Sequence, residues 1–276
     1  MKLGIYIKHD TLESNPQYQD LLAGLRNAGA ELYRVYSAGD LREGTDMLVS
    51  VGGDGTFLSA SKRVGDSGVP VLGVNLGRLG FLSENRVEEV LRDIPSGNYS
   101  IEDRALLDVS VEGAPLGEGF SPYALNEVAV HRRGAAVLGV EASLDGQKLP
   151  VYWADGLLVA TSSGSTAYSL SVGGPICMPE SKVLIIAPIA PHNLNVRPLV
   201  VPDSSSVSIS VIPREDTIML SMDNRSYIVP SDVRLSISVA QFSLKRVRLS
   251  TSGFVKGLTA KLFWGEDVRN GIENRD

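Results

Sequence analysis

The sequence contains a single cysteine and three histidines in 276 residues. One cysteine, Cys177, allows neither an intrachain disulfide nor a cysteine-based metal cluster. His9, His131 and His192 lie far apart along the chain and have none of the spacings at which histidines ligate zinc. We therefore expect no disulfide framework and no metal held by the protein itself.

Long apolar runs and a strong charge of one sign are also missing. No stretch approaches the ~20 apolar residues of a membrane-spanning helix, and the N-terminal MKLGIYIKHD lacks the apolar core of a signal peptide. A net charge of −6 argues against a nucleic-acid binder, which needs clustered Lys and Arg. The one basic cluster, residues 245–248 (KRVR), is interpreted as the outer face of a strand. We expect a cytoplasmic enzyme or binding protein without nucleic-acid or membrane partners.

The composition is that of an ordinary globular protein, with 43% hydrophobic and 21% charged residues. A chain of 276 residues forms one or two domains and buries roughly 75% of the surface that its unfolded form exposes. The fold therefore needs no disulfide or metal to stabilise it, and the hydrophobic pattern is used to predict its secondary structure.

The first hundred residues alternate between strand-like and helix-like patterns. Leu21, Leu22 and Leu25 recur at helical spacing, and Gly29 follows as a C-terminal cap. This rhythm predicts a Rossmann-like parallel sheet that is covered on both faces. The predicted strands are 3–8, 31–36, 46–51 and 69–75, and the predicted helical segments are 16–28, 57–64 and 87–94.

Beyond residue 100 strand-like segments follow one another, and Asp145-Gly146 is a strong hairpin signal. This region predicts an antiparallel, β-sandwich-like domain. Phe254, Leu258 and Leu262 then predict a C-terminal helix that returns to the first domain. The predicted domains are 1–98 joined by 253–276, and 99–252. The predicted strands of the second are 105–112, 125–131, 137–144, 148–153, 207–212, 217–222, 227–229 and 233–239.

A single acid lies among three glycines in VSVGGDGTF, residues 49–57, where a strand passes into a helix. Free N–H groups at a helix start favour phosphate, whereas the plainer interpretation is a tight turn in which Asp54 caps the helix. The P-loop pattern is absent, and Gly73, Gly77 and Gly80 lack the spacing of the dinucleotide fingerprint. The turn is therefore a phosphate-site candidate of another kind.

A second dense region, residues 152–176, is crowded with small and hydroxylated side chains. It suits a surface that closes around a polar, flat ligand, on which Tyr168 can stack, although a serine-rich loop is the plainer interpretation. The polar pair Asn126-Glu127 opens an apolar strand and is a third, weaker candidate.

Taken together, these motifs resemble those of the NAD kinase family, whose members phosphorylate the adenosine ribose 2′-hydroxyl of NAD to give NADP. The glycine-acid motif alone is shared with diacylglycerol-type lipid kinases, and the long motif at 154–176 makes the resemblance specific. The matching stretches follow the family's order: GGDGT at 52–56, GVNLGRLGFL at 73–82, NEVAVHR at 126–132, ADGLLVATSSGSTAYSLSVGGPI at 154–176 and RPLVVPD at 197–203.

The resemblance implies NAD bound in the cleft between the two domains, with Asp54 as the catalytic base. The sequence departs from the family at two positions: some members carry Arg where this chain has Trp153, and others carry Gln where it has Arg225. The implied phosphate turn is Gly52, Gly53, Gly55 and Thr56. The implied NAD-binding residues are Asp54, Gly55, Asn126, Glu127, Asp155, Ser163, Thr166, Ala167, Tyr168, Ser169, Leu170, Ser171 and Arg225.

The expected chemistry is transfer of the γ-phosphoryl group of ATP, which needs positioning and charge neutralisation more than covalent help. Mg²⁺ or another divalent cation is expected on the donor phosphates, and the resemblance implies a homodimer or homotetramer. Two alternatives stay open at this point. One is a lipid kinase of the diacylglycerol type, and the other is a non-catalytic dinucleotide sensor.

Overall fold

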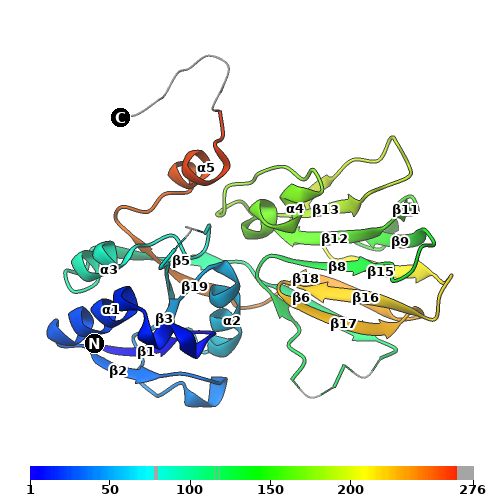
Figure 1. The fold of residues 1–276 in the computed structure, drawn as a ribbon. Helices are drawn as coiled ribbons and strands as arrows, with labels where there is room; N and C mark the ends of the chain where they lie inside the picture. The colour runs from blue at the N-terminus through cyan, green and yellow to red at the C-terminus, as the bar shows by residue number, and fades with distance from the viewer. Residues whose placement is uncertain (78–79, 115, 118, 266–276) are drawn as a thin grey trace. The chain divides into compact units, whose positions relative to one another are not determined.

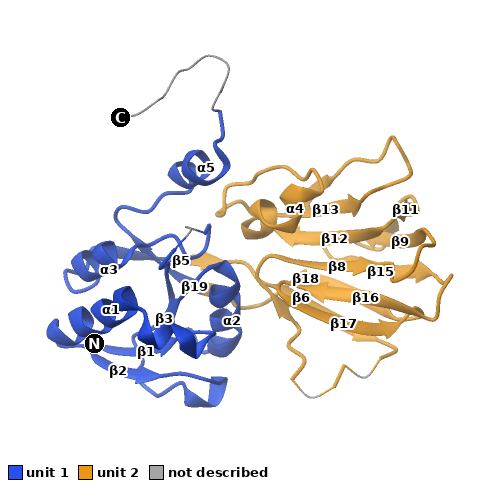
Figure 2. Cartoon of the chain, viewed as in Figure 1, with its two compact units in different colours: residues 1–102, 245–276 blue, residues 103–244 orange. Residues whose placement is uncertain are grey.

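The computed structural model describes residues 1–77, 80–114, 116–117 and 119–265. Contacts within the chain divide it into two compact units, residues 1–102 with those from 245 onward, and residues 103–244 (Figure 2). The sequence prediction sets the boundaries at 98/99 and 252/253. The contacts instead place residues 99–102 and 245–252 in the first unit, and with them all but the first residue of the strand at 244–249. None of the helices in the described residues is long and apolar enough to cross a membrane.

The first unit is built on a six-stranded sheet with the order β2-β1-β3-β4-β19-β5 (Figure 1). The pairings among β1, β2, β3, β4 and β19 are parallel, as the alternating pattern predicts. All five residues of β3 are buried because helices cover both faces of such a sheet. The strands are β1 (Lys2–Tyr6), β2 (Glu31–Arg34), β3 (Met47–Val51), β4 (Val71–Val74), β5 (Tyr99–Arg104) and β19 (Leu244–Leu249).

Two helices of this unit begin at the predicted residues 16 and 87, and the helix predicted at 57–64 begins earlier, at Asp54. Asn15 caps the first, accepting the N–H groups of Gln17 and Tyr18, and Pro16 occupies its first turn. The C-terminal helix is confirmed, and residues 266–276 of its predicted range lie outside the described part. The helices are α1 (Pro16–Asn27), α2 (Asp54–Val64), α3 (Val87–Asp93) and α5 (Phe254–Leu262), with short 3-10 turns η1 (Asp10–Ser14) and η2 (Ala38–Asp40).

The basic cluster at 245–248 is a strand, but not the outer face that the sequence predicts. Arg246 is 4% exposed, and Val247 is fully buried on the opposite side of β19. β19 lies between β4 and β5 in the sheet, and within the cluster Lys245 is exposed and Arg248 partly buried. Arg246 is tolerated there because Glu84 and Glu102 pair with its guanidinium.

The second unit consists of two antiparallel sheets, which confirms the β-rich prediction. Their orders are β10-β9-β15-β18-β6-β7, with β11 on β9, and β14-β13-β12-β8-β16-β17. One apolar core contains residues of both sheets, so the sheets face each other. The strands are β6 (Leu107–Glu112), β7 (Tyr123–Ala124), β8 (Glu127–His131), β9 (Leu138–Leu144), β10 (Gln147–Lys148), β11 (Tyr152–Ala154), β12 (Gly156–Thr161), β13 (Val183–Ile189), β14 (Leu199–Pro202), β15 (Val207–Ile212), β16 (Thr217–Met222), β17 (Arg225–Pro230) and β18 (Arg234–Val239).

The hairpin predicted at Asp145-Gly146 is confirmed by the pairing of Leu144 with Gln147. Both turn residues have positive φ, 50° and 79°, which matches the preference of Asp-Gly for such turns. Strands β12 and β13 were not predicted. Every residue of β12 is buried, so its sequence lacks the alternation of a half-exposed strand.

Candidate functional site

The glycine-acid turn connects β3 to α2. Gly52 has a φ of +145°, and a side chain there would lie 2.5 Å from the Thr56 hydroxyl oxygen, so the turn requires glycine. Gly53 occupies the N-cap position and Asp54 is already the first residue of the helix. The interpretation of Asp54 as the cap is therefore wrong, and its carboxylate is available for other partners.

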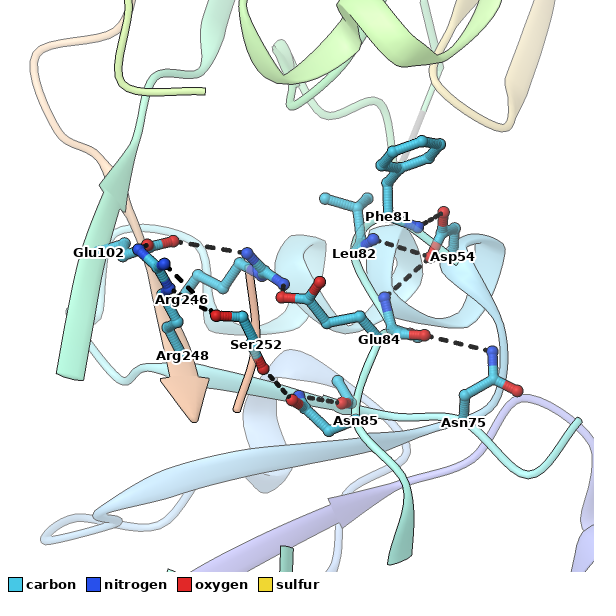
Figure 3. A network of polar contacts seen from close by, with 12 residues as sticks. Asp54, Asn75, Phe81, Leu82, Glu84, Asn85, Glu102, Arg246, Arg248 and Ser252 are labelled. Atoms are coloured by element: carbon cyan, nitrogen blue, oxygen red, sulfur yellow. Dashed lines mark hydrogen bonds and ion pairs between the residues drawn. The ribbon is translucent and has the colours of Figure 1, made fainter. Parts of the chain in front are cut away.

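The carboxylate of Asp54 instead accepts three backbone N–H groups from the segment that follows β4. Phe81 donates to Oδ2 at 2.8 Å, and Leu82 and Ser83 donate to Oδ1 at 3.0 and 2.8 Å (Figure 3). A side chain at Gly80 would lie 1.9 Å from Oδ1, so glycine is needed for this approach. The first two motifs of the sequence thus meet at one carboxylate, and Arg78 and Leu79 of the second lie outside the described residues.

A second carboxylate in the other unit makes the same kind of contact. Asp223 accepts the N–H groups of Leu125, Asn126 and Glu127 at 2.9, 2.8 and 3.3 Å. It sits in the turn between β16 and β17 with a φ of +51°. Sequence reasoning missed this residue, whose only signal is an Asp-Asn pair between two strands. Asp223 orients the backbone of the Asn126-Glu127 pair.

Glu127 is a buried carboxyl group, 7% exposed. Its pKa is raised to about 8, first by burial and second by the neighbouring charge of Asp223, while the N–H group of Tyr168 acts in the opposite direction. Its Oε2 atom has no hydrogen-bond partner in the described protein. A buried acceptor of this kind is expected to meet a partner from a ligand or from water.

Replacing Glu127 with Gln is expected to stabilise the unliganded protein in a pH-dependent way. The folded-state pKa of about 8 lies above the ordinary 4.5, so the unfolded chain releases the proton first as pH rises. Wild-type stability therefore falls across this window, whereas Glu127→Gln escapes the loss, on the order of 2–5 kcal/mol. Urea unfolding at both ends of the window measures the difference. Glu141→Gln, on the exposed side of β9, serves as control, and a difference that does not vary with pH would contradict the expectation.

The hydroxyl-rich segment after β12 folds back onto the Asn126 backbone. Thr161 donates its hydroxyl to the Leu125 carbonyl at 2.6 Å and accepts the N–H group of Gly164 at 3.1 Å. A side chain at Gly164 would lie 2.1 Å from the Asn126 carbonyl oxygen. The segment forms η3 (Ser163–Thr166) and the single-turn helix α4 (Tyr168–Ser171). In the described residues the buried hydroxyls of Ser163 and Ser169 have no hydrogen-bond partner.

Tyr168 stacks on His131 with the ring centroids 5.7 Å apart and the planes 18° from parallel. The ring nitrogen Nε2 of His131 pairs with the Ser221 hydroxyl at 2.9 Å, and burial lowers the pKa of His131. Burial also raises the pKa of Tyr168, as do the charges of Glu127 and Asp155. The structure thus gathers Glu127, Asp155 and Tyr168 in one place.

Two arginines complete the polar surroundings of this unit. Arg132 donates two hydrogen bonds to the Asp155 carboxylate, from Nε at 2.6 Å and from Nη2 at 3.2 Å. Arg225 donates to the backbone carbonyls of Ser121 and Tyr123. Of the predicted residues, Asn126, Glu127, Asp155 and the run 163–171 belong to one constellation in the second unit, and Asp54 with its glycines to another in the first.

Comparison with known proteins shows the family of the chain. The ATP-NAD kinase N-terminal domain family matches residues 20–97, and the ATP-NAD kinase C-terminal domain family matches residues 125–249. An NAD kinase of Flavobacterium johnsoniae is 38% identical, with 98% of this chain and 100% of the relative covered.

Two solved structures are similar to the chain over most of its length. An NAD kinase from Archaeoglobus fulgidus, crystallised in complex with ATP, is 26% identical with a TM-score of 0.75, covering 91% of this chain and 94% of the other. Yeast NADH kinase, complexed with NADH, is 22% identical with a TM-score of 0.83, covering 100% and 90%, and shares the fold. With two family domains in order and the identity extending over nearly its whole length, this chain belongs to the ATP-NAD kinase family.

Proposed function

We propose that the protein transfers the γ-phosphoryl group of ATP to the 2′-hydroxyl of the adenosine ribose of NAD, which yields NADP. The observation that carries this is the Asp54 carboxylate, held by three N–H groups at a glycine turn that opens a helix. Family membership supports a kinase that acts on NAD.

Asp54 acts as the general base in this proposal. Its Oδ1 accepts two hydrogen bonds and its Oδ2 one, so Oδ2 keeps an acceptor site for the substrate hydroxyl. The 2′-hydroxyl oxygen forms the new bond to the γ-phosphorus and gives its proton to this carboxylate, while the bond from that phosphorus to the β,γ-bridging oxygen breaks and ADP leaves. Gly52, Gly53, Gly55 and Thr56 form the turn, and the lack of side chains at the three glycines suits the approach of phosphates.

The second unit holds the dinucleotide in this proposal. Its buried polar atoms without partners, Glu127 Oε2 and the Ser163 and Ser169 hydroxyls, support a polar ligand. Tyr168 offers a ring for the base. The remaining proposed contacts come from Asn126, Asp155, Thr166, Ala167, Leu170, Ser171 and Arg225.

We propose that Mg²⁺ accompanies the donor phosphates, since a phosphoryl-transfer site gains from a cation that neutralises the charge of the phosphate oxygens. Within the described residues no group of three or more His, Cys, Asp and Glu side chains is placed to hold a metal. In this proposal the chain positions the phosphates at the glycine turn.

The test is an acceptor assay with labelled ATP, using NAD and diacylglycerol in parallel, with NADP detected by an NADP-specific dehydrogenase. NADP formation that depends on both substrates supports the proposal. Label transfer to diacylglycerol alone would support the lipid kinase. NAD binding without turnover would support the sensor.

We also propose that the protein is a homodimer or homotetramer. In the second unit, β14 and β17 end one sheet and carry exposed apolar side chains, with Leu199, Val200 and Ile228 at 38%, 45% and 65% exposure. Open strand edges with apolar residues favour association. Light scattering is expected to give a multiple of the chain mass, and Ile228→Arg is expected to shift it downward. A monomer at assay concentration would refute the proposal.

A further inference from the structure

The C-terminal helix α5 contacts the segment that holds Asp54. The ammonium group of Lys261 lies 4.6 Å from the ring centroid of Phe81, and the ring of Phe254 lies 6.1 Å from the same ring. The backbone N–H of Phe81 is one of the three donors to the Asp54 carboxylate. Two residues of α5 therefore rest on a residue that orients the proposed base.

The charge of Lys261 is buried at an unusual place. Its side chain is 9% exposed, and its Nζ atom makes no hydrogen bond in the described part of the chain. The nearest recorded carboxylate oxygen, Oε2 of Glu84, is 3.8 Å away. Burial lowers the pKa of Lys261, while the negative charges of Glu84 and Asp54 act in the opposite direction. A methionine would fill this space without the free-energy cost of burying a charge. Filling the space therefore does not explain why the residue at this position is a lysine.

Close approach of the helix is built into its sequence. A side chain at Gly257 would lie 3.2 Å from Lys261 Nζ and 3.6 Å from the Phe81 ring. Glycine at this position lets the lysine lie along the helix, over the aromatic ring. A cation over a ring in a desolvated place is attracted by the ring's negative face, worth about 2 kcal/mol.

The other end of the segment is anchored from the sheet. Arg246 of β19 donates to Glu84, and its guanidinium also pairs with Glu102 at 3.4 Å (Figure 3). Residues 81–84 are thus held at Phe81 by Lys261 and at Glu84 by both Lys261 and Arg246. The three N–H groups that face Asp54 lie between these anchors.

We propose that Lys261 is a positioning residue for phosphoryl transfer: its buried ammonium fixes the segment 81–84, and the segment fixes the Asp54 carboxylate toward the substrate hydroxyl. This inference rests on the proposed function, because only a turnover that uses Asp54 reports its orientation. General-base catalysis depends on the position of the carboxylate, and small displacements lower the rate strongly.

The experiment compares Lys261→Met with Lys256→Met, an exposed lysine of the same helix. Removing the ammonium is expected to lower kcat about 10- to 30-fold, which is the factor that corresponds to the energy of a desolvated cation–π contact. The KM for NAD is expected to change less than about twofold. Lys256→Met is expected to match the wild type. Lys261→Arg keeps a charge over the ring and is expected to recover most of kcat.

Phe81→Leu provides a second route, since it removes the ring and leaves the lysine. We expect a similar loss of kcat, and the double variant with Lys261→Met is expected to be no worse than either alone. A normal kcat in both Lys261→Met and Phe81→Leu overturns the positioning role, as do additive losses. A wild-type enzyme that forms no NADP refutes the proposed function itself, so the two failures are distinguishable.

Discussion

Replacing Asp54 with asparagine is expected to lower kcat for NAD phosphorylation by about 10²- to 10⁴-fold, the typical effect of removing a general base. Asparagine keeps the size of the side chain but cannot take the proton of the 2′-hydroxyl. The affinity for NAD is expected to change far less, because the proposed dinucleotide contacts lie mainly in the other unit. Steady-state kinetics and calorimetric NAD binding on the same preparation measure both quantities.

The structure adds a second effect that the sequence did not indicate. Both oxygens of Asp54 accept N–H groups, and the amide of asparagine offers only one acceptor oxygen. With that oxygen toward Leu82 and Ser83, the amide nitrogen faces the Phe81 N–H group, and the lost hydrogen bond costs about 1–3 kcal/mol. The melting temperature of Asp54→Asn is therefore expected to fall as well.

A structural control separates lost stability from lost chemistry. Asp93 is 1% exposed in the same unit and accepts hydrogen bonds from Arg92 and Ser250. Asp93→Asn is expected to lower the melting temperature comparably and to leave kcat within about threefold of the wild type. If Asp54→Asn lost stability alone and kept a near-normal kcat, Asp54 would be an anchor for the segment 81–83 and not the base.

Replacing Tyr168 with alanine is expected to raise the KM for NAD by roughly 5- to 150-fold. This range corresponds to base–aromatic stacking worth about 1–3 kcal/mol. One face of the ring already stacks on His131, which holds the tyrosine plane in place before a ligand arrives. A preoriented ring loses little entropy on binding, which favours a large share of the stacking energy.

Tyr168→Phe is the matched control, since it keeps the ring and removes the hydroxyl. It is expected to raise the KM less than about threefold. The ring also packs beside a small apolar cluster that includes Leu158 and Ala160, and this suggests the competing interpretation. An unchanged KM in Tyr168→Ala, together with normal folding, would make Tyr168 a core residue only.

Local features of the chain were predictable from the sequence because they depend on neighbouring residues. The turn at Asp145-Gly146 follows from the positive φ that both residues tolerate. Helix α1 begins at Pro16, directly after the capping side chain of Asn15. The parallel sheet of the first unit follows from the alternation of strands and helices. The glycine turn around Asp54 was also predictable, because glycines allow another group to approach the backbone closely, whichever group that is.

Features that join distant segments appeared only in the tertiary structure. Sequence spacing does not indicate that the N–H groups of residues 81–83 donate to the Asp54 carboxylate. Nor does it indicate that those of residues 125–127 donate to Asp223, almost one hundred positions away. The strands β12 and β13 were missed because burial on both faces removes the alternation that marks a strand. Arg246 was taken for a surface residue because only the fold brings Glu84 and Glu102, which are distant in the sequence, beside its guanidinium. A residue's type is a local property, but its burial and its partners are set by which segments the fold brings beside it.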